Sequence, residues 1–174
     1  MSSKRAAAEG NKEMLYEILR LLAKLEDSTP EKITASLVSK YDKSPAGKLW
    51  YMEQRGYVKW SENAYALTPK GRAKLVEREV WELSISTPKR WDGRWHLVLF
   101  DIPKDRRKRR DVFRLHLKQL GLVLYQNSIW VHPYPLEHQV RAISDFYMLS
   151  KFVSFAIAER LTGEAHLRQR FNLN

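Results

Sequence analysis

The apolar run Leu97–Phe100, inside the segment Trp95–Pro103, most constrains what this chain can fold into. Its residues favour a short buried β-strand. Pro103 ends the strand, because proline cannot donate a hydrogen bond to a sheet ladder. Behind the strand, apolar residues recur at the spacing of an amphipathic helix, at Phe113, Leu117 and Leu120. A strand followed at once by a helix is therefore predicted.

The helix is expected to begin with an unusual charge. Asp105 is the expected N-cap, and the five residues Arg106–Arg110 that follow are all cationic. A helix N-terminus favours anions by ~0.3–1 kcal/mol per charge, so helix stability does not account for this run. We expect an anionic partner and leave two open. One is phosphate, and the other is the acids of a second subunit, with Glu137, Asp145 and Glu159 as candidates.

The composition favours a polyanion as the partner. The chain has 174 residues, a formal net charge of +11 and no cysteine. This excess of Lys and Arg is typical of proteins that bind nucleic acid. The absence of cysteine excludes disulfides and thiolate zinc sites, and the five histidines lack metal-binding spacing. No membrane partner is expected, because no apolar run approaches ~20 residues, and we expect a cytoplasmic protein.

In the first half of the chain, the spacing of apolar residues changes from helical to strand-like after Gly56. Residues 1–10 are small and polar and are expected to fray. Helical spacing then appears over 11–25, in a short helix that contains Ile33, Leu37 and Val38, and from Ser44 through Arg55. The segment 41–43 is expected to break the second of these helices. The segments 57–60 and 65–67 predict a hairpin, and Thr68-Pro69 begins a last helix. This order predicts a winged helix-turn-helix DNA-binding domain over residues 1–75.

Helical geometry divides the third predicted helix into two faces. Leu49 and Met52 are expected to face the core, and Gly56 is expected to end the helix. A second stripe, spaced by four, three and four, is expected to enter the major groove, and the hairpin is expected to lie over the DNA backbone or minor groove. A solvated face in a protein-binding module remains the alternative. The candidate DNA-binding residues here are Ser44, Lys48, Tyr51, Arg55, Lys59, Ser61 and Asn63.

The second half repeats a strand and helix pattern. After a linker over 76–90, strands are predicted at 97–100, 122–125, 128–131 and 151–158, with helices over 105–120 and 136–149. This strand-helix-strand-strand-helix-strand order is the ferredoxin-like βαββαβ arrangement, so the expected fold is α+β with a dimerisation domain over 91–174. His116 and His132 are expected to be structural, and Trp95, Phe100 and Trp130 to be core residues. The arginines and apolar residues after 159 are expected to dock on a partner subunit.

Two motifs carry a resemblance to a known family. Trp95-x-Leu-Val-Leu-Phe-Asp-Ile-Pro103 with the arginines after it, and Ser128-Ile-Trp-Val-x-Pro133, resemble the PaaX-type repressors of phenylacetate catabolism. In those regulators a winged-helix domain precedes a domain similar to the small endonuclease of CRISPR adaptation. Tyr125-x-x-Ser128-Ile129 is similar to a motif of that nuclease. The resemblance implies a transcriptional regulator, a repressor. We expect it to act as a homodimer on palindromic double-stranded DNA, with the second domain pairing two chains.

The role of Asp101 distinguishes the regulator hypothesis from the hypothesis that the protein is an enzyme. The matching Asp of the nuclease family is credited with binding a divalent metal, so the resemblance makes Asp101 the candidate catalytic and metal-binding residue of a Mg²⁺-dependent endonuclease or a DNA-integration scaffold. The alternative is that Asp101 accepts hydrogen bonds from the next turn or pairs with the arginines. For the regulator we expect no cofactor, with Arg106, Arg107, Arg109 and Arg110 as further DNA-binding candidates. A small-molecule effector is compatible with the sequence but not indicated, and an RNA-binding module is a third, weaker hypothesis.

Overall fold

The protein is described here by a computed structural model, which describes residues 2–25, 28–37, 40–41 and 44–173. The chain forms two compact units, Met1–Glu79 and Val80–Asn174. Both mix helices with an antiparallel sheet, so the α+β class predicted from the sequence is confirmed. Within the described part of the chain, none of the helices combines the length and the apolar character that crossing a membrane requires.

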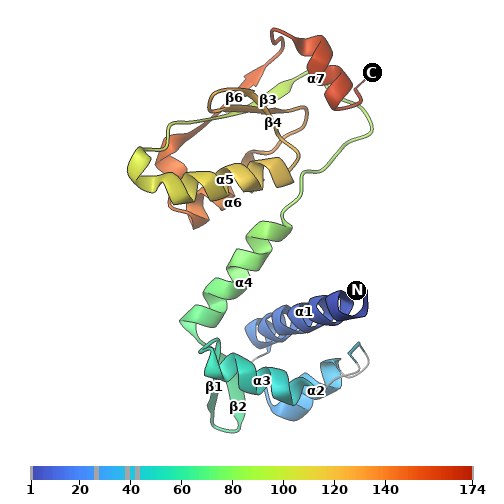
Figure 1. Ribbon diagram of the computed structural model, residues 1–174, viewed down its shortest axis with the longest axis vertical. Helices are drawn as coiled ribbons and strands as arrows, with labels where there is room; N and C mark the ends of the chain where they lie inside the picture. Colours follow the sequence, from blue (N-terminus) through green and yellow to red (C-terminus); the bar gives the residue numbers. More distant parts are fainter. Residues whose placement is uncertain (1, 26–27, 38–39, 42–43, 174) are drawn as a thin grey trace. The chain divides into compact units, whose positions relative to one another are not determined.

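The first unit contains three helices, a hairpin and the start of a fourth helix (Figure 1). The hairpin strands pair antiparallel, with Val58 opposite Leu67 and Ser61 opposite Ala64. Helix α4 continues across the boundary between the units, ending three residues beyond Glu79. The elements are α1 (Ser2–Lys24), α2 (Pro30–Leu37), α3 (Pro45–Gln54), β1 (Val58–Ser61), β2 (Ala64–Leu67) and α4 (Pro69–Glu82).

Helix α1 begins earlier than its apolar spacing predicted. Its backbone is helical from Ser2, so the expectation that residues 1–10 fray is wrong for 2–10. Three consecutive alanines, Ala6–Ala8, favour helix without contributing an apolar stripe, and the periodicity therefore missed them. The expected contribution of Val38, and the expected break at Asp42 and Lys43, lie outside the described residues.

The core of the first unit is built by apolar residues at the predicted helical spacing. Ile18, Leu19 and Ile33 are completely buried, and Leu49 and Met52 of α3 are 2% and 0% exposed. Ser44 caps α3 as its side chain accepts a hydrogen bond from the Ala46 N–H at 3.3 Å. Gly56 has a φ of +68°, which fits the glycine predicted to end this helix. The core face of α3 is thus fixed, and its opposite face is left for solvent or a partner.

The second unit is a four-stranded antiparallel sheet with two longer helices (Figure 1). The strand order is β4-β5-β3-β6, so the first strand of the unit lies between the third and the fourth. Leu97 of the central strand pairs with Val131 on one side and Ala156 on the other. The elements are β3 (Trp95–Phe100), η1 (Lys104–Arg106), α5 (Arg107–Gln119), β4 (Val123–Gln126), β5 (Ile129–His132), α6 (Glu137–Phe146), η2 (Ser150–Phe152), β6 (Val153–Ala158) and α7 (Glu164–Arg170).

Each face of this sheet has its own core. On one face Val98, Phe100 and Trp130 pack with Phe113 of α5 and Ile143 of α6. The helices themselves lie side by side there (Figure 1). The other face carries a smaller cluster, which contains Trp95, Leu97, Val131, Leu167 and Phe171. The expectation that Trp95, Phe100 and Trp130 are core residues is confirmed, since they are 0%, 5% and 2% exposed.

The chain end and the first turn of α5 differ from the sequence predictions. Leu167 of α7 is 4% exposed, because it packs with Phe171 on the sheet of its own chain. Leu167 is therefore not available for the docking on a partner subunit that the sequence predicted. Asp105 lies within the short helix η1 and caps nothing, because α5 begins only at Arg107. The N-cap position of α5 is occupied by Arg106. Asp105 lies one residue too early for its carboxylate to accept from the first free N–H groups of this helix.

Residues 80–85 of the predicted linker pack on the second unit. Val80 is 7% exposed in the helix-side core, and Leu83 and Ile85 pack against that core. The Gln119 side chain donates a hydrogen bond to the Trp81 carbonyl, and Gln139 donates to the Ser84 carbonyl at 3.0 Å. Apolar burial and these two bonds hold residues 80–85 on the helices of this unit.

Candidate nucleic-acid interface

The exposed side of α3 groups three of the candidate DNA-binding residues. The Tyr51 ring has Lys48 Nζ at 5.3 Å from its centroid and Arg55 Cζ at 5.3 Å. Both distances are those of cation–π contacts. Tyr51 is 38% exposed, and Arg55 is exposed beside it. One aromatic ring therefore orients two cations on the solvent side of α3, where both could contact phosphate.

The hairpin presents the other candidates of the first unit. Lys59, Ser61 and Asn63 are all exposed. Glu62 and Asn63 have φ values of +52° and +62°, the left-handed pair that a tight hairpin turn requires. The Trp60 N–H donates to Glu53 Oε1 of α3 at 3.4 Å, which ties the hairpin to the helix. Helix and hairpin thus form one connected surface.

Sequence analysis did not name two aromatic side chains of this surface, Trp50 and Trp60. Trp50 is 63% exposed on α3, and Trp60 is 44% exposed on β1. The Trp60 ring packs edge-on against Tyr65 at a centroid distance of 4.8 Å. Tryptophan is usually largely buried, and the predicted core positions of Leu49 and Met52 were the signal that could have placed Trp50 on the outer face of the helix.

The basic run of the second unit divides into two groups. Arg106 and Arg109 turn toward the end of α6, donating to the Met148 carbonyl at 3.3 Å and the Tyr147 carbonyl at 3.4 Å. The negative end of the α6 macrodipole lies there, so it stabilises cations that the start of α5 disfavours. The Arg106 guanidinium also lies 5.2 Å from the Phe152 ring centroid. These two arginines have a structural explanation that the sequence did not provide.

The remaining cations of the run face solvent or an acid of their own helix. The Arg107 side chain is 79% exposed and lies 3.7 Å from Asp111. Arg110 lies 3.9 Å from the same carboxylate, with its side chain 26% exposed. Of the acids expected to pair with the run, Glu137 pairs with Arg141 at 2.5 Å, and Asp145 accepts from the Ser150 hydroxyl. Arg107 and the exposed Lys108 are therefore the cations of the run best placed for phosphate.

Asp101 lies in an open hollow at the end of β3. It is exposed, and its backbone N–H donates to the Phe152 carbonyl at 3.0 Å. The hollow measures about 590 Å³, and Ser128, Lys151 and Ser154 also line it. Among the described residues, no three metal-ligating side chains come together. One carboxylate beside an ammonium is a poor donor set for Mg²⁺, which needs several hard oxygen ligands, so these residues do not fit a metal site on one chain.

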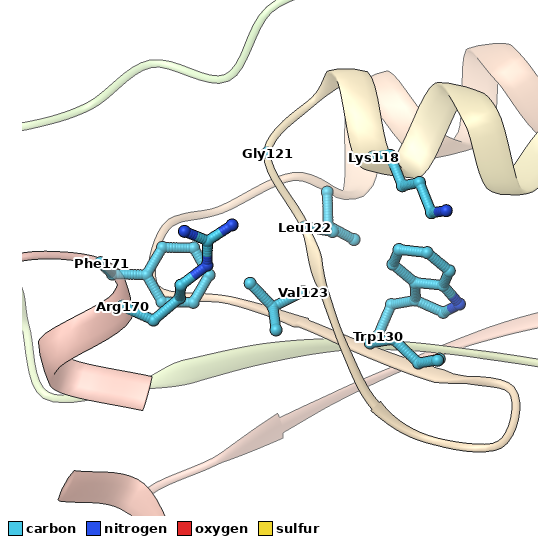
Figure 2. Close-up of a pocket in the computed structure, with 8 residues that line it drawn as sticks. Lys118, Gly121, Leu122, Val123, Trp130, Arg170 and Phe171 are labelled. Atoms are coloured by element: carbon cyan, nitrogen blue, oxygen red, sulfur yellow. The ribbon is translucent and has the colours of Figure 1, made fainter. Parts of the chain in front are cut away.

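A second hollow, of about 550 Å³, lies between the end of α5, strand β4 and α7 (Figure 2). Leu122, Val123 and Phe171 form apolar walls, and Lys118 and Arg170 carry cations into the lining. The Trp130 indole N–H is buried without a hydrogen-bond partner in the described structure. The volume is in the range of small-ligand sites. No motif indicated this hollow, because its lining comes from three separate segments of the chain.

The histidines expected to be structural are buried and partnered. His116 is 1% exposed, stacks on Trp81 at a centroid distance of 3.6 Å and lies 3.0 Å from the Tyr147 hydroxyl. Burial lowers the pKa of His116 to about 4. Burial also lowers the pKa of His132, whose Nδ1 accepts from the Tyr134 N–H at 3.1 Å. Both rings are therefore neutral near pH 7.

Comparison with known proteins identifies the second unit. Residues 88–169 match the family described as the PaaX protein central Cas2-like domain. This stretch is therefore similar to the Cas2-like domain of PaaX proteins, the class to which the motifs pointed. The resemblance to PaaX-type proteins inferred from the sequence is confirmed for this stretch of the chain.

Two further comparisons add little to the family match. No curated protein is significantly similar to the chain. One solved structure, "Uncharacterized protein Rv0674 from Mycobacterium tuberculosis", is 19% identical and superposes with a TM-score of 0.46. The match covers 88% of this chain and 63% of that one, so the chain spans less than two thirds of the length of that protein.

Proposed function

We propose that the chain is a DNA-binding transcriptional regulator, a repressor, that acts as a homodimer on a palindromic site. The observation that carries the proposal is the joined surface of α3 and the hairpin, where Lys48 and Arg55 each lie 5.3 Å from the centroid of the Tyr51 ring. The family match of residues 88–169 supports the same class of function.

The finer fold assignment belongs to this proposal. Three helices followed by a two-stranded hairpin support a winged helix-turn-helix, with α3 as the recognition helix and β1–β2 as the wing. The strand order β4-β5-β3-β6, with both longer helices packed in one core, supports a ferredoxin-like second domain. The first domain would read DNA and the second would pair two chains.

The proposed contacts differ in kind between the two domains. Ser44, Lys48, Tyr51 and Arg55 would face the major groove, and the wing residues Lys59, Ser61 and Asn63 would lie over the adjacent backbone. Paired chains would place two recognition helices on half-sites one helical turn, about 34 Å, or a multiple of it apart. In the second domain, Arg107 is the most exposed of the arginines proposed to contact phosphate, while Arg106, Arg109 and Arg110 have partners within the chain.

The proposal is tested by selecting binding sites from random duplexes with the full chain and then measuring affinity against salt. We expect a palindromic consensus, and a decrease of about 0.9 log unit of affinity per phosphate contact for each log unit of salt. Lys48→Gln and Arg55→Gln should each weaken binding and reduce the slope by about one contact. Lys32→Gln, an exposed cation of α2, is the matched control and should change neither. No enriched sequence, or no salt dependence, would refute the proposal.

A metal-dependent nuclease or a DNA-integration scaffold is the second candidate. It rests on one observation, the exposed Asp101 at the end of the central strand of a Cas2-like domain. A second copy of the chain would have to supply the remaining metal ligands. The same selection with Mg²⁺ or Mn²⁺ added tests this candidate. Cut duplexes that Asp101→Ala no longer produces would favour the nuclease, and intact duplexes after prolonged incubation would exclude cleavage.

A further inference from the structure

The outermost face of α3 is not the stripe on which the cations lie. Residues advance by about 100° around an α-helix, so the face opposite the buried Leu49 and Met52 contains Gly47, Trp50, Tyr51 and Gln54, spaced at i, i+3, i+4 and i+7. All four are exposed. Lys48 and Arg55 flank this face on the Tyr51 side. A helix that enters a groove presents this outer face to the base edges, and its flank to the phosphates.

The chemistry of the outer face is specific. Gln54 presents an exposed side-chain amide, a group that can bond in a bidentate manner to N6 and N7 of adenine. Trp50, one turn earlier on the same face, presents an apolar ring that is 63% exposed. An apolar side chain beside a base edge favours the C5-methyl group of thymine. In the major groove, an adenine edge and a thymine methyl group are presented together by one A·T pair or by two adjacent A·T pairs.

The shape of the face permits the approach that such contacts need. A Cβ added at Gly47 would meet no atom within 4 Å, so the N-terminal end of the face is open. With no side chain at Gly47, the helix backbone can come close to the bases at this end, and Trp50 and Gln54 follow one and two turns later on the same face. The flanking cations Lys48 and Arg55 make a polyanion the occupant that this face fits by charge. The acids nearby are Glu53, engaged by the Trp60 N–H, and Glu62 at the hairpin tip.

We infer that Trp50 and Gln54 determine sequence specificity, with Gln54 reading adenine and Trp50 reading a thymine methyl at the centre of each half-site. This inference rests on the proposed DNA-binding function and names the base pairs that the same surface reads. Lys48 and Arg55 then supply affinity without sequence information, because contacts to phosphate do not depend on the base.

The test uses the full chain and the duplex that it selects from a random pool. Each thymine is replaced in turn by deoxyuridine, which lacks only the methyl group, and each adenine by 7-deazaadenine, which lacks the N7 acceptor. At one position per half-site we expect wild-type affinity to decrease about fourfold for the missing methyl group, the worth of one buried carbon. We expect a decrease of about tenfold for the missing N7, within the range of a bidentate base contact.

Variants of α3 distinguish the proposed base contacts of Trp50 and Gln54 from the phosphate contacts of Lys48 and Arg55. Trp50→Ala should bind thymine and uracil duplexes alike while keeping the deazaadenine penalty, and Gln54→Ala should do the reverse. Lys48→Gln is the matched control on the same helix, and it should weaken binding while both penalties stay. Gly47→Ala should raise the melting temperature, as alanine favours helix, and should still weaken binding by filling the open end of the face.

The outcomes distinguish this inference from the proposed function. If no duplex is enriched, the DNA-binding proposal itself fails. If a duplex is enriched but neither base analogue affects wild-type binding, or if Trp50→Ala and Gln54→Ala keep both penalties, the regulator remains and the assignment of these two residues is wrong. Circular dichroism of each variant checks folding, and Trp50→Phe, which keeps an apolar ring, should retain part of the methyl preference.

Discussion

Gly71→Ala is the substitution for which the structure predicts the clearest effect on the first unit. A Cβ at Gly71 would lie 1.9 Å from the Tyr57 carbonyl oxygen and 2.9 Å from the Tyr57 carbonyl carbon. Ordinary contact begins near 3.4 Å, so α4 and the start of β1 would have to separate by more than an ångström. Both atoms that collide with the new methyl group are backbone atoms, and a change of rotamer cannot relieve the clash.

The expected cost is the balance of three effects. Overpacking costs ~1–3 kcal/mol. The Tyr57 carbonyl accepts hydrogen bonds from the Thr68 N–H and the Thr68 hydroxyl, both at 3.1 Å, and a shift of this backbone weakens two bonds worth ~1 kcal/mol each. Alanine in a helix returns ~0.5–1 kcal/mol. The net loss is ~3 kcal/mol, about a hundredfold in the folding equilibrium of the unit.

The assay is amide hydrogen exchange followed by mass spectrometry on the full chain, which reports each unit separately. Gly71→Ala should lose protection across Met14–Leu75 and leave Trp95–Ala158 unchanged, and it should bind DNA weakly. Gly10→Ala is the matched control, because a Cβ there meets nothing within 4 Å, and it should stabilise α1 slightly. A Gly71→Ala protein as protected as wild type, or one that loses protection only in the second unit, would refute the packing argument.

Three further predictions concern the second unit. The free energy of unfolding should decrease as pH falls from 6.5 toward 4, because His116 binds a proton in the unfolded state but stays neutral in the folded state, where its pKa is about 4. At pH 4 the loss is ~3 kcal/mol. Urea unfolding of a His116→Phe variant should show a shallower pH dependence. Arg109→Gln should destabilise the unit by ~1–2 kcal/mol through the end of α6, whereas Arg107→Gln, 79% exposed, should cost below ~0.5 kcal/mol and weaken DNA binding instead; equal stability effects would contradict the division of the basic run. Trp130→Phe should cost little stability despite the burial of Trp130, because its indole N–H has no hydrogen-bond partner in the described structure, and a loss above ~3 kcal/mol in thermal unfolding would show that an acceptor is present.

The sequence predicted the elements well wherever one face of an element is apolar. The strand that ends at Phe100, the helix behind it and the order of the later strands all follow from periodicity, and the structure has them within a few residues. Periodicity failed at the start of α1, where alanines make helix without a stripe. It also failed after Glu159, where Leu167 and Phe171 pack on the sheet of their own chain.

The sequence did not predict which arginines of the basic run bond within the chain, or which tryptophan side chains are exposed. The run Arg106–Arg110 is one motif in the sequence, yet two of its arginines bond the end of α6, some forty residues later in the chain. Trp95 and Trp50 are the same residue type, and one is 0% and the other 63% exposed.

The sequence by itself determined the order of helices and strands, the buried faces and the family of the second unit, because apolar spacing and local motifs are properties of neighbouring residues. Only the tertiary structure decided which cations remain available to a polyanion and that residues 80–85 pack with the second unit. Those features depend on contacts between segments far apart in the chain, where a carbonyl, a ring or an open space stands opposite a side chain only after folding.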